Sequence, residues 1–214
     1  MDVLTVKHIE IIIETMTDII IENEVPFCQL DSAAGDGDFG MSLAKGFKEV
    51  KARSGELSRE SIGHFLKDVG MIITEYCGGA SGPIWGSAFR SAAKYSAGAA
   101  ALDLNGIAEM LNCAVEGIQK RGGAKLGDKT LLDALIPAAQ SLRISANSGL
   151  SISEASKLAA VSAVQGGEKT RSYVASKGRA SYLGERSLDY PDAGAVAIGV
   201  IFTGISKKLE DILK

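Results

Sequence analysis

Apolar residues recur at helical spacing along almost the whole chain, and this periodicity constrains the fold more than any other feature of the sequence. From Ile9 to Glu22, isoleucines and a methionine share one helical face while acidic residues occupy the others. Period-two alternation bounded by turns, the pattern of a half-buried strand, is missing. The sequence therefore predicts an all-α fold of eight helices. The further helices are expected at about 40–53, 59–76, 84–98, 105–120, 130–146, 152–172 and 194–213.

Signals for helix N-termini support these limits, because Ser, Thr and Asp side chains accept hydrogen bonds from the free N–H groups of a first turn. Proline also suits a first turn, where its missing N–H costs nothing. The expected start signals are N-caps at Thr5, Ser58 and Asp103, a capping box of Ser151 with Glu154, and Pro83 in a first turn.

Length and charge bound the class of protein. A chain of 214 residues with 46% apolar content can bury a full core, and without a visible linker we expect one domain over residues 1–214. The net charge is −3, whereas a nucleic-acid-binding protein usually has an excess of Lys and Arg, so no nucleic-acid partner is expected. No signal peptide is apparent, and the longest apolar stretch, 193–202, is too short to cross a bilayer.

The cysteines indicate a compartment. Cys28, Cys77 and Cys113 are odd in number and widely spaced, which matches neither a disulfide framework nor a zinc site. We therefore expect a cytoplasmic protein with no membrane partner.

The order of the loops predicts where a site would form. Consecutive helices joined by short loops run antiparallel, so the connections after the first, third, fifth and seventh helices emerge at one end of the bundle. All four are rich in glycine and charge, and glycine lets a phosphate or a ring approach the backbone near helix N-termini. These connections are expected at about 30–40, 77–83, 121–130 and 177–194.

The first of these loops carries three aspartates in eight residues, Asp31, Asp36 and Asp38, with glycines between them and no Lys or Arg. Two carboxylates about 4 Å apart repel by roughly 4 kcal/mol at an effective dielectric near 20. Oxygen ligands without His or Cys favour hard divalent cations, and Mg²⁺ usually completes its shell with water and phosphate oxygens. The run therefore predicts a Mg²⁺-phosphate site.

Two other interpretations of this run stay open. Asp and Gly are common in surface turns, so the run could simply reverse the chain. A calcium-binding EF-hand is less well supported, because the twelfth position counted from Asp36 is Phe47, where a bidentate Glu should stand.

Other motifs give weaker signals. Gly122 to Thr130 resembles a Walker A loop with one residue too many before Lys129 and no preceding strand, which leaves Lys129 free for a phosphate or a surface ion pair. The segment 79–83 resembles a nucleophile elbow but ends in proline, so Ser81 is better interpreted as an N-cap with a hydroxyl for phosphate. Trp85 stands at core spacing one turn before Phe89 and is expected to pack. The two histidines, His8 and His64, receive no role.

Four motifs occur together in order: Leu-Asp-x-x-x-Gly-Asp-Gly-Asp-x-Gly at 30–40, Gly-Gly-Ala-Ser-Gly-Pro at 78–83, Gly-Asp-Lys-Thr-x-x-Asp-Ala-Leu at 127–135, and Gly-Arg-Ala-Ser-Tyr-Leu-Gly-Glu-Arg-Ser at 178–187. With them the chain resembles the nucleotide-binding L subunit of dihydroxyacetone kinase, the DhaL/DAK2 family, over nearly its whole length. The resemblance implies a barrel-like bundle of eight antiparallel helices with the nucleotide at one end.

The resemblance also implies site residues. Asp31, Asp36 and Asp38 would hold two Mg²⁺ ions that bridge the phosphates of ADP or ATP, as cofactors of a phosphotransferase. The interpretation requires this triad to lie at the same end as Ser81 and Arg179. The implied nucleotide-binding residues are Phe39, Gly40, Met41, Ser42, Ala80, Ser81, Gly122, Leu131, Arg179, Asp192, Ala193 and Gly194.

By the same resemblance, the acceptor, dihydroxyacetone or a related short keto-sugar, would be held by a separate K subunit through its own histidine. The donor would be either exchanging ATP or a phosphohistidine protein, the M subunit of a sugar phosphotransferase system, which rephosphorylates a retained ADP. Phe39 and Ser42 replace the His and Asn that the family commonly has, and residues 188–194 depart from its Gly-His-x-Asp-Pro-Gly run. These departures alter the surroundings of the metal site and leave the acceptor and donor open.

Two other functions are carried forward. L subunits of this family can also act as nucleotide-sensing partners of a regulator, without turnover, and an intact triad is compatible with that role. A helical scaffold whose aspartate loop only turns the chain would show no affinity for Mg²⁺-nucleotide.

Overall fold

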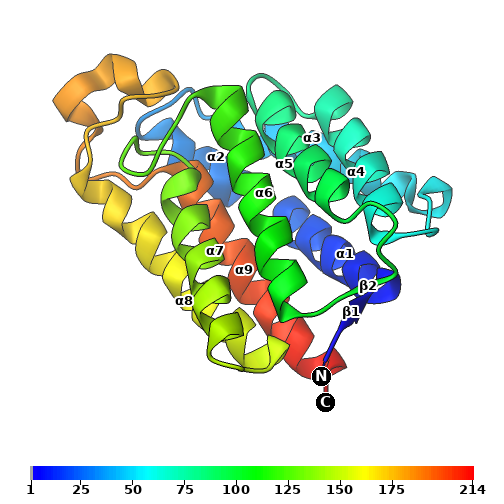
Figure 1. Ribbon diagram of the computed structural model, residues 1–214. Helices are drawn as coiled ribbons and strands as arrows, with labels where there is room; N and C mark the ends of the chain where they lie inside the picture. The colour runs from blue at the N-terminus through cyan, green and yellow to red at the C-terminus, as the bar shows by residue number, and fades with distance from the viewer. Residues whose placement is uncertain (1) are drawn as a thin grey trace.

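The computed structural model describes residues 2–214, and this part of the chain is mostly helical (Figure 1). The all-α prediction is confirmed. The α-helices are α1 (Val6–Glu22), α2 (Glu24–Ser32), α3 (Phe39–Ala52), α4 (Ile62–Tyr76), α5 (Ser81–Tyr95), α6 (Leu104–Gly122), α7 (Leu132–Asn147), α8 (Ile152–Lys169) and α9 (Ala193–Ile212). The short elements are the 3₁₀ turns η1 (Ser54–Glu56), η2 (Thr170–Ser172) and η3 (Arg179–Ser187) and the strands β1 (Leu4–Thr5) and β2 (Ala101–Leu102).

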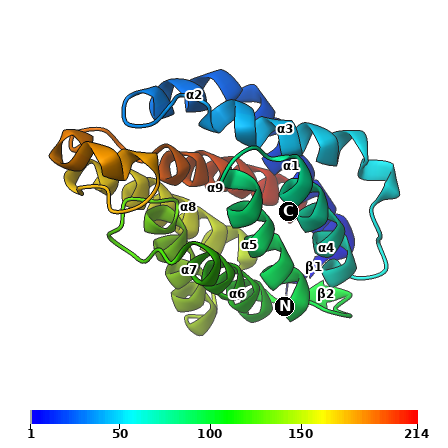
Figure 2. The same cartoon turned by 90° about the horizontal axis from the view of Figure 1, so that it is seen from above.

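The long helices pack in a closed ring. Helix α1 packs against α3, each helix from α3 to α8 packs against the next, and α9 returns to α1 (Figure 2). Each helix thus has two neighbours in the ring and turns its apolar face inward, which is how amphipathic helices bury their hydrophobic stripes.

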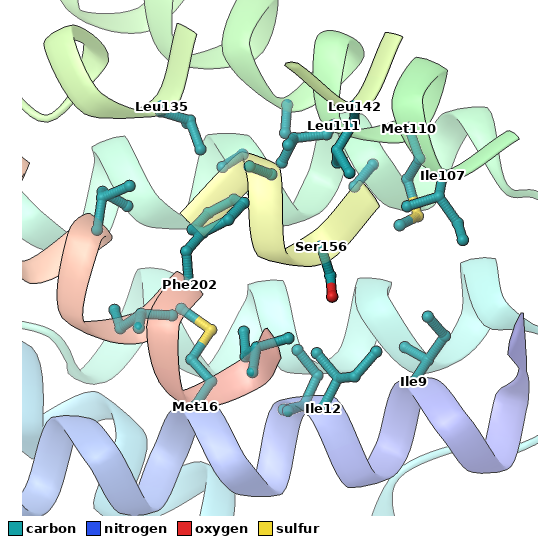
Figure 3. Close-up of a pocket in the computed structure, with 18 of the residues that line it drawn as sticks. Ile9, Ile12, Met16, Ile107, Met110, Leu111, Leu135, Leu142, Ser156 and Phe202 are labelled. Carbon is teal, nitrogen blue, oxygen red and sulfur yellow. The ribbon is translucent and has the colours of Figure 1, made fainter. Parts of the chain in front are cut away.

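One hydrophobic core fills the ring, with fully buried side chains such as Phe47, Phe65 and Ile201. Within it lies a cavity of about 220 Å³. Apolar side chains of α1, α6, α7 and α9 converge on this space, as Figure 3 shows for Met16, Leu111 and Phe202, and the Ser156 hydroxyl is a polar group among them. The centre of the ring is therefore mostly apolar.

The structure corrects the expected number of helices. Residues 24–32 form a separate helix, α2, which makes nine α-helices in the described part of the chain instead of eight. Helix α2 has nine residues and buries mainly Phe27, so it lacks the repeating apolar face that reveals the other helices. It packs against α3 and α9 (Figure 1) and places the aspartate loop after α2, not after α1.

Most of the expected start signals are found. Asp103 accepts from the N–H of Gly106, Ser151 and Glu154 form the capping box, and Pro83 lies in the first turn of α5. The N-cap expected at Ser58 is wrong, because α4 begins three residues later, after Ser61, whose hydroxyl accepts from His64 N. The N-cap expected at Ser81 is also wrong, because Ser81 is the first residue of α5 and the N-cap position is Ala80, with no side-chain cap hydrogen bond. The two-residue ladder of β1 with β2 was also not expected.

Among the described residues, none of the helices combines the length and the apolar character needed to cross a membrane.

Candidate functional site

A second cavity, of about 270 Å³, opens at one end of the helix ring. All four connections that were expected to meet contribute to its wall. The segment around η3, orange in Figures 1 and 2, lies beside the end of α2 that leads into the aspartate loop. The wall is made by residues within 30–42, 78–85, 129–131, 177–180 and 191–194.

The three aspartates come together in this cavity. Asp31 lies in the last turn of α2, and its Oδ2 accepts hydrogen bonds from Gly37 N at 2.8 Å and Phe39 N at 3.4 Å. These bonds fold the loop back on the helix, with Gly37 at a positive φ of 75° that suits glycine. Carboxylate oxygens of Asp31, Asp36 and Asp38 all lie within 4.8 Å of one another. The loop thus presents three acidic groups to one point.

The electrostatics of this cluster favour a cation. Burial raises the pKa of Asp31, and the negative charges of Asp36 and Asp38 raise it further, while the N–H groups of Phe39 and Gly37 act in the opposite direction. Arg179 reaches across from η3 and forms an ion pair with Asp36 at 2.9 Å. Close carboxylates without His or Cys match the ligand set of a hard divalent ion, so the donors present fit Mg²⁺.

Nine of the twelve residues expected around the nucleotide line the same cavity. They surround the N-terminal ends of α3, α5 and α9, where free N–H groups and the positive end of the helix dipole favour an anion. The triad and these residues therefore meet at one end of the fold, as the interpretation requires. The nine are Phe39, Ser42, Ala80, Ser81, Leu131, Arg179, Asp192, Ala193 and Gly194.

The structure places the other three outside the cavity wall. Gly40 is buried in the crossing of α3 with α2, where a Cβ atom would lie 2.0 Å from the carbonyl oxygen of Glu24. Met41 is 57% exposed on the outer surface. Gly122 ends α6 and contacts Ile84, which itself lines the cavity.

Comparison with known proteins decides the family. The family model described as DAK2 domain matches residues 33–207. The chain belongs to the DAK2 domain family. The match begins two residues after Asp31, so the first member of the triad lies in α2 just before the matched residues.

Several relatives of this DAK2 domain are dihydroxyacetone kinases or their subunits. The ADP-binding subunit DhaL of the PEP-dependent dihydroxyacetone kinase of Escherichia coli K12 is 37% identical over 79% of this chain and 80% of its own. The corresponding subunit of kinase 1 from Listeria innocua is 34% identical over 85% of each chain. The dihydroxyacetone kinase of C. freundii superposes with a TM-score of 0.74 at 27% identity, over 93% of this chain and 34% of that enzyme. A second structure of that kinase, in complex with AMP-PNP and Mg²⁺, matches equally well.

Sequence reasoning missed several wall residues of the DAK2 domain. Thr130, Lys177 and Ile84 line the cavity and were not singled out. Trp85 packs edge-on against Phe47, with ring centroids 6.3 Å apart, so the expected packing role is confirmed, although the residue also borders the cavity. Thr130 belongs to the third motif, while Ile84 and Lys177 stand next to the second and fourth motifs, and this was the available signal.

Lys129 has neither of the two roles considered for it, which were a phosphate contact and a surface ion pair. Its side chain is not on the surface, because the residue is only 2% exposed, and the expected surface ion pair is therefore wrong. Its ammonium group instead donates to three backbone carbonyl groups, which also leaves it without a free donor for a phosphate.

Asp192 gives the cavity a pH-sensitive group. It caps α9 by accepting from Ala195 N at 2.8 Å, and burial raises its pKa to about 7. Between the ordinary value of 3.8 and about 7, the unfolded chain loses this proton before the folded one does, so the free energy of unfolding falls as the pH rises.

We expect Asp192→Asn to remove this dependence, since Asn keeps an oxygen that can accept from Ala195 N. Between about pH 5 and pH 8, the free energy of unfolding of the wild type should fall by about 1–2 kcal/mol relative to that of the variant. This is less than the full effect of the raised pKa, because the side chain borders solvent in the cavity. Urea unfolding of both proteins at the two pH values measures the difference. Parallel pH profiles would contradict the raised pKa.

Proposed function

We propose that this DAK2 domain is the nucleotide-binding subunit of a kinase for dihydroxyacetone or a related short keto-sugar. The observation that carries the proposal is the meeting of three carboxylates, three helix N-termini and Arg179 around one cavity. The same assignment is supported by the relatives, which are ADP-binding subunits of dihydroxyacetone kinases, and by the C. freundii kinase in complex with AMP-PNP and Mg²⁺.

In the proposed site, Asp31, Asp36 and Asp38 hold two Mg²⁺ ions. The ions would neutralise charge on the phosphate oxygens, the main requirement of phosphoryl transfer. The backbone N–H groups of Gly37 and Phe39 orient Asp31, and this fixes the direction in which the carboxylates face the cavity. The site therefore needs no Walker-type lysine.

The chain's own cationic and dipolar groups complete the proposed phosphate site. The guanidinium of Arg179 forms an ion pair with Asp36 of the triad and can place donors on a phosphate oxygen while it remains there. The first turns of α5 and α9 direct free N–H groups at the cavity from two further sides. The remaining requirement is the acceptor, which we assign to a separate K subunit that docks over this end of the ring.

The donor follows from the relatives named PEP-dependent or PTS-dependent, for which we infer a phosphohistidine M subunit that rephosphorylates a retained ADP. Exchange with free ATP is the alternative. We place this chemistry in the cytoplasm, and the three free cysteines are compatible with a reducing compartment.

A transfer assay with K-type subunits tests the proposed function. We expect phosphoryl flow to dihydroxyacetone or to L-erythrulose, because relatives from Pectobacterium atrosepticum and Mycolicibacterium smegmatis are named L-erythrulose kinases. Mass spectrometry of the denatured protein separates the two donors, since retained ADP indicates the phosphohistidine route and an empty pocket indicates ATP. ADP-dependent binding to a regulator without any turnover would contradict the kinase assignment and support the sensor.

A further inference from the structure

The connection between α6 and α7 holds Lys129 in an unusual backbone conformation. Its φ is +61°, in the left-handed region that residues other than glycine seldom adopt. The carboxylate of Asp133 holds the turn on both sides of Lys129, because it accepts from Gly127 N at 2.5 Å and from Thr130 N at 2.7 Å. The strained position is thus maintained by its surroundings, and it directs the lysine side chain inward.

Inside the protein, the ammonium group of Lys129 meets three carbonyl oxygens. It donates to Thr170 at 2.9 Å, to Tyr173 at 3.0 Å and to Ser187 at 2.6 Å. An ammonium has three donors, so these three acceptors use all of them. Burial lowers the pKa of Lys129, while Asp192 and Asp189 favour its charged form.

The three carbonyl groups lie on both sides of the segment that carries Arg179. Thr170 and Tyr173 precede this segment, and Ser187 ends it. The ammonium group of Lys129 therefore joins the two ends of a loop whose middle forms one wall of the nucleotide cavity.

A second set of bonds fixes the same loop to the same turn. Asp128 accepts from the Ser176 hydroxyl at 2.8 Å through its carboxylate and from Ser176 N at 3.2 Å through its carbonyl group. Ser187 closes the base of the loop by accepting from Ala175 N at 3.0 Å. Beyond this base the loop projects outward, with Tyr182 87% exposed and Arg179 directed back to Asp36.

We propose that Lys129 is a positioning residue that ties together the two ends of residues 170–187 and so sets where Arg179 stands in the cavity. It acts on protein backbone and not on a phosphate group. The proposal rests on the proposed function for the identity of the ligand beside Arg179, whereas the tie itself can be tested without any ligand.

The first test is limited trypsin digestion of the ligand-free protein. We expect Lys129→Met to accelerate cleavage after Lys177, Arg179 and Arg186 by about tenfold or more, because proteolysis follows the population of locally opened loop. Cleavage after Arg59, in the connection between α3 and α4, should be unchanged. Lys125→Met, an exposed lysine of the same turn, is the matched control and should digest like the wild type.

Equal digestion of Lys129→Met and wild type, or equal acceleration at Arg59, would overturn the proposal. Circular dichroism establishes first that the variant folds. Lys129→Gln keeps an amide donor in a similar place, so its loop should be cleaved at a rate between those of the wild type and Lys129→Met. If Lys129→Met fails to fold, Lys129→Gln is compared with the wild type in its place.

The second test asks whether Lys129 acts through Arg179. We expect Arg179→Gln to weaken Mg²⁺-dependent ADP binding about tenfold in the wild type but less than about twofold in Lys129→Met, since residues that act together are not additive. If the two losses multiply instead, Lys129 acts independently of Arg179, and the proposal is overturned. If the wild type binds no ADP, the proposed function fails, and the digestion alone decides the role of Lys129.

Discussion

Asp36→Asn should abolish Mg²⁺-dependent ADP binding and phosphoryl transfer while the helical content stays intact. Asp36 supplies one of three carboxylates whose oxygens lie within 4.8 Å of one another, and its side chain also forms the ion pair with Arg179. Asn keeps the shape but removes the charge that the cation needs. Mutation of a residue that only supports a metal ligand typically lowers metal affinity or activity by about 10–100-fold. We therefore expect the loss of a ligand itself to lower the affinity for ADP by at least about 100-fold. Isothermal titration calorimetry with Mg²⁺ present measures it.

Two companion variants separate the charge effect from other causes. Asp211→Asn, an exposed aspartate of α9 that pairs with Lys214, should bind ADP like the wild type. Arg179→Gln removes the ion pair but leaves all three carboxylates, so its loss should be clearly smaller than that of Asp36→Asn. Wild-type affinity in Asp36→Asn would exclude the triad as the metal site.

Gly40→Ala should be strongly destabilising. A Cβ at this position would lie 2.0 Å from the Glu24 carbonyl oxygen and 2.9 Å from Cys28 N, both backbone atoms that cannot turn aside. Helix α2 would have to move, and with it Asp31 at its end. We expect a loss of about 2–3 kcal/mol in the free energy of unfolding, within the range of overpacked cores, together with weaker ADP binding. Urea unfolding and calorimetry measure the two effects.

The matched control is Gly55→Ala, where the same added methyl group has no atom within 4 Å. There we expect a change within about 0.5 kcal/mol, or slight stabilisation from the reduced freedom of the unfolded chain. If Gly40→Ala weakened ADP binding without any loss of stability, Gly40 would contact the ligand, and the packing role would be wrong.

Helical periodicity predicted most of the fold because each long helix turns one apolar face to the same core. Helix α2 escaped this reasoning, since nine residues that bury mainly Phe27 carry no repeating pattern. The meeting of the four loops was predictable from the alternation of helix direction alone. The closed ring was implied only by the family resemblance, because the packing of α9 against α1 joins the two ends of the chain and leaves no local signal in the sequence.

The sequence predicted which segments form the site, but helix geometry determines which residues of each segment line the cavity. Phe39 and Ser42 are three residues apart, so they share the face of α3 that lines the cavity. Gly40 and Met41 lie between them in the sequence but face other sides of the helix. A motif that identifies a run of residues therefore includes some that support the site without lining it.

The partners of Lys129 were beyond sequence reasoning. The three carbonyl groups belong to residues that follow Lys129 by 41, 44 and 58 positions in the sequence. Any residue type can supply a backbone carbonyl group, so no side chain signals these contacts. A lysine in a glycine-rich loop indicates a phosphate by composition. Only the fold reveals that its three donors are already used.

The central claim is that the triad binds ADP through Mg²⁺. Titration of ADP into the nucleotide-stripped wild type, once with Mg²⁺ and once with EDTA, tests this most directly. We predict saturable binding that weakens by at least about 100-fold in EDTA, since the phosphates would otherwise face three uncompensated carboxylates. Equal affinity under both conditions, or no binding with Mg²⁺, would contradict the account.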